Sequence, residues 1–319
     1  MAMYPERQTT NTYRMKKIAR LASKNFFRDY QIYLLILPSI LVIFIFNYIP
    51  MYGIQIAFKD FRFKEGIVGS QWVGLKHFFH FLTMDHFWLT LKNTVTIQLY
   101  SLIIGFPAPI LLAILLNECV HRKFKKAVQM ISYAPYFIST VVMCGMILLF
   151  TNNNTGVINN IMALLGFQRI NFMIEPKWFQ TVYVFSGVWQ GVGWSSIIYL
   201  AAMSGIDPEL IEAAVIDGAN RFQKIWHIDL SSIAPTIIIL LIFSLASLLG
   251  VGFEKILLLQ NSLNMEASDV ISTYVYRIGL IGAQYSFTTA IGLFNTLVSF
   301  LLLVIVNFIA KRLSDVSLF

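Results

Sequence analysis

The sequence predicts an all-α membrane protein with six transmembrane helices. Of its 319 residues, 57% are hydrophobic and only 13% are charged, whereas a soluble domain carries about 25% charged residues. The apolar residues form long runs and do not follow the spacing of an amphipathic surface helix. Such runs suit a bilayer, because a helix that crosses the hydrocarbon needs roughly 20 mostly apolar residues.

The first element is a polar, basic tail over residues 1–29, which we expect in the cytoplasm. An apolar run follows it. A cleavable signal peptide has a shorter apolar core that ends in small residues, but this run ends in Asn47, Tyr48 and Pro50. We therefore expect it to remain as the first span of a permease domain that covers residues 30–319.

Six segments have the length and composition of a span. They are predicted at about residues 30–54, 91–117, 127–150, 178–203, 234–259 and 287–309. Three longer segments lie between them on one side of the membrane, at about residues 55–90, 151–177 and 260–286. Aromatic residues cluster just before the second span, which favours elements that lie at the membrane interface.

The basic residues predict that both termini lie in the cytoplasm. The tail holds seven of them, the short 118–126 loop adds four, and Lys311 and Arg312 follow the last span. On the opposite side, Lys and Arg are spread over three longer segments. There, Asp60 and Glu65 offset Lys59, Arg62 and Lys64, so that we interpret this group as a solvated loop.

Several classes of site are not supported. The net charge of +8 is explained by basic residues beside apolar runs, with no basic and aromatic stripe for nucleic acid. Cys119 and Cys144 lack metal or disulfide spacing and are interpreted as packing residues. His77 and His80 share helical spacing without a third ligand, so that interfacial packing is favoured over a metal.

No catalytic signature is present either. The sequence contains no GxxxxGK[ST] phosphate loop, no HExxH and no GxSxG. We therefore expect that this chain is not an enzyme and does not hydrolyse ATP itself.

The segment 206–232, between the fourth and fifth spans, holds the most specific local pattern. Asp207 suits the N-cap of a short helix, Pro208 suits its first position, and Gly218 suits a left-handed termination. Asn220 and Gln223 suit the cap of a second short helix that runs toward Ile228, before Pro235 at the start of the fifth span. The first helix has an apolar face made of Leu210, Ile211, Ala214 and Val215. An apolar face on a loop predicts a partner.

This segment resembles the EAA loop of binding-protein-dependent ABC importer permeases. The resemblance rests on Glu212-Ala213-Ala214, Asp217-Gly218-Ala219 and Ile228-x-Leu230. It implies the type I ABC importer permease architecture, with cytoplasmic coupling helices. One departure is Ser231, which stands where the family usually has proline, although Pro235 matches a second common proline.

The resemblance extends over nearly the whole chain and is closest to the carbohydrate branch. It is carried by Tyr48-Ile49-Pro50-Met51-Tyr52-Gly53, Ala57-Phe58-Lys59-Asp60-Phe61, Trp72-Val73-Gly74-Leu75, Ile271-Ser272-Thr273-Tyr274-Val275-Tyr276-Arg277 and the Asn295 region. Within this branch the pattern is similar to permeases for oligosaccharides and polysaccharides, alginate permeases among them.

The resemblance implies a role for the loop and a set of partners. The coupling residues would be Glu212, Ala213, Ala214, Asp217 and Gly218. Glu212 would meet a basic residue in a groove of an ATPase subunit. The partners would be a second homologous permease, two ATP-binding-cassette ATPases that hold ATP and Mg²⁺, and an external solute-binding protein. This chain itself would bind no cofactor and would sit in the cytoplasmic membrane of a bacterium.

Polar and aromatic residues within the predicted spans are candidates for a substrate path, because such groups are costly to expose to lipid. The candidates are Gln190, Trp189, Trp194, Asn93, Asn295 and Glu254, with Gln98 near Asn93. The alternative is helix packing, which Gly187-x-x-x-Gly191 favours, and Lys255 beside Glu254 would simply pair with it.

Two other functional classes are alternatives to an ABC importer permease. An ATP-independent secondary transporter or channel would show internal symmetry and helices interrupted near the midplane, and neither is evident. A membrane enzyme would need paired catalytic groups at a common depth, and none is found.

Overall fold

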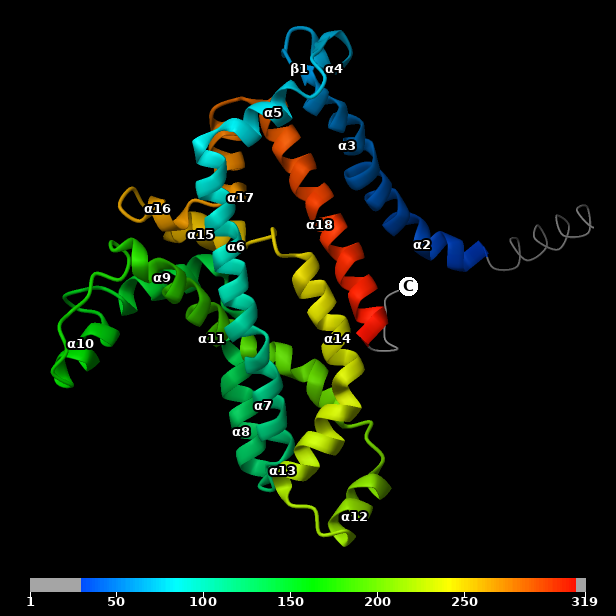
Figure 1. Cartoon of the computed structure of the whole chain (residues 1–319), viewed down its shortest axis with the longest axis vertical. Helices are drawn as coiled ribbons and strands as arrows, with labels where there is room; N and C mark the ends of the chain where they lie inside the picture. The colour runs from blue at the N-terminus through cyan, green and yellow to red at the C-terminus, as the bar shows by residue number, and fades with distance from the viewer. Residues whose placement is uncertain (1–29, 314–319) are drawn as a thin grey trace, which may run out of the picture.

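The computed structural model describes residues 30–313, and the predicted basic tail over residues 1–29 lies outside them. Figure 1 shows an elongated arrangement of helices. The described part has one small sheet, in which β1 (Lys59–Asp60) pairs antiparallel with β2 (Gln71–Trp72). The predicted all-α class is confirmed.

The first span is one continuous helix over Tyr30–Phe58. It consists of α2 (Tyr30–Ile43), a π-helical turn η1 (Phe44–Tyr48), α3 (Ile49–Met51) and a 3₁₀ segment η2 (Tyr52–Phe58). None of its most apolar stretch is buried against the rest of the chain. Its apolar side chains are therefore left for lipid or a partner subunit.

The small sheet and two short helices, α4 (Gly66–Gly69) and α5 (Lys76–Thr83), form one end of the molecule. Lys59 is buried there. Its Nζ donates to the carbonyl of Ile67 at 2.6 Å and lies 4.8 Å from the ring centroid of Trp72. The prediction of a solvated loop is therefore wrong for Lys59, because backbone oxygens and an aromatic face replace water around its ammonium.

The two neighbouring histidines make separate contacts. The Nε2 of His77 lies 3.1 Å from the carbonyl oxygen of Lys59, and His80 packs against the ring of Phe287 with centroids 5.2 Å apart.

The second span is longer than predicted, because it begins at Asp85 and not near residue 91. It joins α6 (Asp85–Gly105) to α7 (Pro107–Asn117) in a 33-residue helix. Pro107 stands at the first position of α7, where its missing N–H costs least.

The third predicted span is not a straight helix. It forms α8 (Arg122–Tyr133), a 3₁₀ turn η3 (Ala134–Phe137) and α9 (Thr140–Phe150), with a bend of 104° at the break. Pro135 lies in the turn, and the Ser139 hydroxyl accepts a hydrogen bond from the Val142 amide to begin α9. The basic residues predicted for the 118–126 loop lie mostly on the first turn of α8.

The fourth predicted span coincides with α11 (Pro176–Met203), which follows the short α10 (Val157–Leu164). α11 packs against α6, α7, α8 and α14. Glycine, serine and glutamine residues lie among the apolar residues of α11 and lower its mean hydropathy. For this reason α11 is not among the four helices of the described residues that are long and apolar enough to cross a membrane. Those helices are Tyr30–Phe58, Asp85–Asn117, Arg221–Ala246 and Tyr285–Arg312.

Counting the bent pair of α8 and α9 as one span raises the number to five among residues 30–313. The predicted count of six is therefore not confirmed. The difference arises from α11, because a helix that faces polar neighbours or a path does not need a uniformly apolar surface.

The fifth span begins earlier and ends earlier than predicted. It consists of α13 (Arg221–Lys224), a π-helical turn η4 (Ile225–Asp229) and α14 (Leu230–Ala246). The predicted second short helix is thus the first turn of this span. Both Ser231 and Pro235 lie inside the continuous helix, so that Pro235 is not at its start.

The chain then leaves this span and forms a series of short helices before the last span. They are α15 (Phe253–Leu259), α16 (Met265–Ser268), α17 (Ile271–Val275), the π-helical segment η5 (Tyr276–Ile281) and α18 (Tyr285–Leu313).

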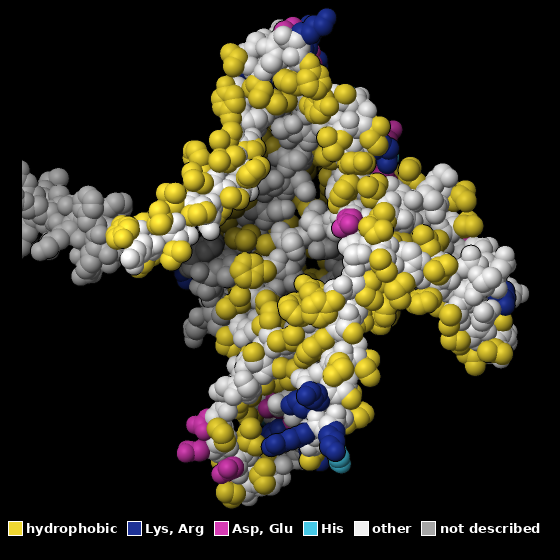
Figure 2. All heavy atoms as spheres, turned by 180° about the vertical axis from the view of Figure 1, so that it is seen from behind, with side chains coloured by type: hydrophobic (Ala, Val, Ile, Leu, Met, Phe, Trp, Pro, Cys, Tyr) yellow, Lys and Arg dark blue, Asp and Glu magenta, His cyan; other side chains and the backbone are white. Residues whose placement is uncertain are grey.

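The distribution of side chains fits a membrane protein. Figure 2 shows hydrophobic side chains over the middle of the molecule, while most charged side chains gather at its two ends. The largest buried cluster joins α6, α9, α11 and α15 through Ile97, Met143, Phe179 and Ile256. Cys144 lies in the same cluster, which confirms the prediction that it is a packing residue.

Candidate functional site

The segment 206–232 protrudes at one end of the molecule, around α12 (Pro208–Ile216) (Figure 1). The side chain of Asp207 accepts a hydrogen bond from the Glu209 amide at 3.0 Å, and Pro208 occupies the first turn. The predicted N-cap is therefore confirmed. A carboxylate there also opposes the positive end of the helix dipole.

The C-terminus of α12 is fixed by a Schellman motif. Gly218 has φ +77°, its amide donates to the carbonyl of Val215 at 3.1 Å, and the Ala219 amide donates to the carbonyl of Ala214 at 2.9 Å. These are the two bonds that define the motif, and glycine adopts the left-handed conformation without a Cβ penalty. The chain turns sharply at Gly218 as a result.

The next helix starts immediately with a reciprocal cap. The Gln223 amide donates to Asn220 Oδ1 at 2.9 Å, and the Asn220 amide donates to Gln223 Oε1 at 2.8 Å. The predicted capping box is confirmed. Residues 207–229 therefore form a rigid unit of two capped helix ends, which we call the elbow.

The apolar surface of the elbow divides into two faces. Val215 and Ile216 are exposed, together with Leu210, Phe222 and Trp226. Ile211 and Ala214 line a cavity of about 370 Å³ between the elbow and the turn that follows α7, and the exposed Val215 also reaches its wall. The predicted single face therefore splits, and its outer part is the surface available to a partner. Glu212 and Ala213 of α12 are exposed, and so is Asp217, its C-cap residue.

An ion cluster that the sequence pattern did not indicate attaches the elbow to the rest of the molecule. Lys224 of α13 pairs with Glu118, which follows α7, and its Nζ lies 3.8 Å from Asp229 Oδ2. Asp229 is fully buried, and neither carboxylate oxygen has a hydrogen-bond partner within residues 30–313. Lys224 is thus the cation that compensates two carboxylates at the base of the elbow.

Higher along the molecule, two adjoining cavities of about 420 and 360 Å³ lie against α6, α7 and α11, and the larger is also bounded by α14 and the smaller by α15. Both are lined by Gln98, Ser101 and Ser195, and the smaller one also by Gln190 and Lys255. The amides of the two glutamines donate to backbone carbonyls, Gln98 to Ser247 at 3.2 Å and Gln190 to Ile138 at 3.1 Å. Their side-chain oxygens remain available as acceptors.

The other candidates for a substrate path lie elsewhere. Asn93 is buried and donates to the carbonyls of Glu266 and Asp269 at 2.8 and 3.0 Å. Trp194 stacks on Tyr136, with ring centroids 4.6 Å apart. These contacts give both residues a packing role within this chain.

Trp189 and Glu254 are exposed, and neither is among the residues that line the two cavities. Asn295 lies on α18, and its Oδ1 is buried without a hydrogen-bond partner in the described residues. Lys255 does not pair with Glu254, which corrects the prediction. Its ammonium instead donates to the carbonyl of Tyr183 at 2.9 Å.

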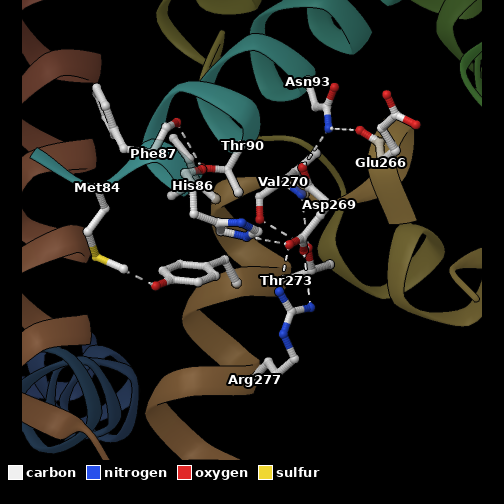
Figure 3. A network of polar contacts seen from close by, with 12 residues as sticks. Met84, His86, Phe87, Thr90, Asn93, Glu266, Asp269, Val270, Thr273 and Arg277 are labelled. Atoms are coloured by element: carbon white, nitrogen blue, oxygen red, sulfur yellow. Dashed lines mark hydrogen bonds and ion pairs between the residues drawn. The ribbon is translucent and has the colours of Figure 1, made fainter. Parts of the chain in front are cut away.

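Asp269, between α16 and α17, is the centre of a second polar network (Figure 3). Its carboxylate is fully buried and accepts hydrogen bonds from Arg277 at 2.6 and 3.2 Å and from Thr273 at 2.9 Å, and it lies 2.8 Å from His86 Nε2. Burial raises the pKa of this carboxyl, but the hydrogen bonds from Arg277, Thr273 and His86 outweigh it and hold the pKa below its ordinary value. The network fastens α6 to the segments before α18.

We expect Asp269→Asn to destabilise the protein, because it removes the anion from a buried pair and leaves Arg277 without its counter-charge. The loss is about 3 kcal/mol at pH 7. Since the folded-state pKa is depressed, the stabilisation is present above about pH 4 and is lost as the pH falls through the folded pKa. Thermal unfolding in nanodiscs at pH 7 and pH 3 measures both effects.

The control for this prediction is Glu266→Gln, an exposed carboxylate on the same segment. It should change stability by less than about 0.5 kcal/mol. An Asp269→Asn protein as stable as wild type at pH 7, or equally destabilised at pH 3, contradicts the assignment.

The comparisons with known proteins agree with this geometry. Residues 105–315 match the family described as the binding-protein-dependent transport system inner membrane component. The polygalacturonan/rhamnogalacturonan transport system permease protein YteP of Bacillus subtilis is 41% identical over 307 residues, covering 96% of this chain and 95% of the relative. Protein LplB of the same organism is 40% identical, with 92% of each chain covered.

Among solved structures, the chain is similar to a chain of the bacterial alginate ABC transporter in complex with an alginate pentasaccharide-bound periplasmic protein. The identity is 41% and the TM-score is 0.85, over 92% of this chain and 99% of that chain. These relatives are transport permeases. We conclude that the chain belongs to the family of binding-protein-dependent transport system inner membrane components, as an ABC transporter permease of its sugar-importing group.

Proposed function

We propose that this permease carries an acidic oligosaccharide or polysaccharide, of the alginate class, across the cytoplasmic membrane into the cell. The observation that carries the proposal is the identity of about 40% over almost the full length to a permease named for polygalacturonan and to a chain of the alginate transporter. Both names refer to polymers of uronic acids, so that a carboxylate-bearing chain is the substrate class they share.

The proposed transporter contains three kinds of protein partner. A second, related permease completes the path, two ATPases hold ATP and Mg²⁺ and dock on the elbows, and an external solute-binding protein delivers the saccharide. The exposed apolar face of Leu210, Val215 and Ile216, with Glu212 beside it, supports the elbow as the ATPase contact. Closure of the ATPases moves the elbow and switches the permease between outward-open and inward-open states.

The elbow defines the cytoplasmic end in this proposal, and both chain termini lie on that side. Figure 2 shows lysine and arginine side chains gathered at the end that carries the elbow. The basic first turn of α8 begins near the same end, after α7. This agrees with the preference of basic residues for the cytoplasmic face.

The experiment is uptake by the complete transporter in proteoliposomes, with ATP inside and the cognate binding protein and a labelled oligouronate outside. We expect uptake that requires ATP, Mg²⁺ and the binding protein together. Uptake that continues without ATP would instead support a secondary transporter. No uptake of the oligouronate, combined with ATP-dependent uptake of a neutral oligosaccharide, would contradict the substrate class.

A further inference from the structure

Lys255 is a buried cation that has no anionic partner among residues 30–313. Its side chain belongs to a residue that is 9% exposed, its Nζ donates to the carbonyl of Tyr183 at 2.9 Å, and the same atom lies 4.7 Å from the Tyr183 ring centroid. Among the carboxylates of residues 30–313, none forms an ion pair with it. Burying an ammonium without a counter-charge is costly, so that the arrangement points to a ligand that supplies the negative charge.

The ammonium lies at the wall of a cavity. Lys255 is one of the residues that line the space of about 360 Å³ between α6, α11 and α15. A Cβ at Gly187 of α11 would come within 3.4 Å of Lys255 Nζ. The amine therefore reaches from α15 directly to the backbone of α11, beside the Gln190 side chain that lines the same space.

The cavity has no acidic wall. Neither this space nor the adjoining one of about 420 Å³ is lined by an aspartate or a glutamate. Glu254 precedes Lys255 in the sequence, but it is exposed, and successive residues of a helix point about 100° apart. Lys255 therefore makes the field in the cavity positive, and its burial strengthens that field because protein atoms screen a charge less than bulk water does.

The neutral groups around Lys255 suit a sugar. Gln98 and Gln190 each donate an N–H to a backbone carbonyl, and their side-chain oxygens are left as acceptors for hydroxyl groups. Ser101 and Ser195 add hydroxyl groups to the same cavity wall. Lysine has three N–H donors, of which the carbonyl of Tyr183 uses one.

We propose that Lys255 is the charge-selective residue of the translocation path, whose ammonium binds the carboxylate of a uronate unit while the glutamines and serines bind its hydroxyls. The inference rests on the proposed function, because it assumes that saccharide passes through these cavities. The carboxylate supplies the counter-charge that the chain lacks, and a charge-assisted hydrogen bond of this kind is about twice as strong as a neutral one.

The test compares two substrates in proteoliposomes that contain the complete transporter. One is a labelled oligouronate, and the other is the same oligomer after its carboxyl groups have been reduced to alcohols. The ratio of the two uptake rates is measured for wild type, Lys255→Met, Lys255→Arg and Lys177→Met. The binding protein is the same throughout, so that its own preference cancels when the ratios are compared.

We expect Lys255→Met to lower the ratio of acidic to neutral substrate uptake about tenfold or more. Lys255→Arg should keep most of the wild-type ratio, because arginine keeps the positive charge. Lys177→Met is the control, since Lys177 is an exposed lysine in the first turn of α11 that pairs with Glu175 and does not line the cavities, and it should leave the ratio unchanged. A Lys255→Met ratio within twofold of wild type overturns the inference. Absence of ATP-dependent uptake of either saccharide by wild type would instead overturn the proposed function.

A second measurement uses the unmodified protein, in case Lys255→Met prevents assembly. A water-soluble carbodiimide joins a carboxylate to an amine in direct contact, and mass spectrometry of the oligouronate-loaded transporter locates the adducts. We expect an adduct on Lys255. Adducts confined to other lysines would contradict the inference.

Discussion

Replacement of Gly218 by valine is expected to abolish ATP-driven uptake while leaving the rest of the permease folded. Gly218 has φ +77°, where a β-branched residue is a genuine outlier, and the left-handed conformation costs an L-residue about 1–2 kcal/mol even before branching is considered. In the Gly218→Val variant, we expect the elbow to relieve this strain by losing the two Schellman hydrogen bonds to the carbonyls of Val215 and Ala214. We expect α12 then to change direction, so that its apolar face is no longer placed for the proposed contact with the ATPase.

The chain offers a matched control at Gly166. This glycine ends α10 with φ +82°, and the same two bonds close its turn, from Gly166 to the carbonyl of Ala163 and from Phe167 to that of Met162. A Cβ would meet nothing within 4 Å at either glycine. Gly166→Val therefore carries the same backbone strain away from the elbow, and we expect it to keep uptake within about twofold of wild type. Equal loss in both variants would mean that strain, and not the elbow, is responsible.

Lys224→Met should have the second large effect. It leaves Asp229, which is fully buried, and Glu118 without the cation that they share. Removing one partner of a buried ion cluster costs about 3–5 kcal/mol. We expect the elbow to detach from the turn after α7, so that hydrogen exchange speeds up over residues 207–229 and the ATPase no longer copurifies.

A compensating change distinguishes the ion cluster from a general loss of packing. Lys224→Met combined with Asp229→Asn and Glu118→Gln removes both uncompensated charges and should restore most of the hydrogen-exchange protection. Lys177→Met is the surface control, because its pair with Glu175 is exposed and worth at most about 1 kcal/mol. A triple variant as unstable as Lys224→Met alone would refute the electrostatic explanation.

Local chemistry was the part of the molecule most readily predicted from the sequence. Three local features each depend on residues within a few positions of one another. They are the N-cap at Asp207, the turn at Gly218 and the capping box of Asn220 and Gln223. Such signals can be read in order along the chain. The apolar runs likewise predicted most of the helices, because length and composition decide whether a segment suits a bilayer.

What the sequence could not predict depends on residues distant in the chain. Lys224 and Glu118 are 106 positions apart, and His86 and Asp269 are 183 apart. Only the packing of the helices brings them together. The bend between α8 and α9 also escaped prediction, since an apolar run reads the same whether it is straight or bent by 104°.

The boundaries of the fifth span show a related limit. Residues 247–252 interrupt an apolar stretch that hydropathy treats as continuous, and the interruption moves Lys255 from a predicted span onto the separate helix α15. One signal was available, because Gly250 and Gly252 stand inside the run. Once α15 is separate, Lys255 faces the cavity while Glu254 is exposed, and the two do not pair.

If the elbow couples substrate delivery to ATP hydrolysis, as we propose, a change in the elbow should alter the stimulated ATPase activity of the reconstituted transporter. The hydrolysis rate is measured before and after addition of saccharide-loaded binding protein, for wild type, Gly218→Val and Gly166→Val. We expect hydrolysis to rise in wild type and Gly166→Val but not in Gly218→Val. A normal rise in Gly218→Val, with uptake preserved, would contradict it.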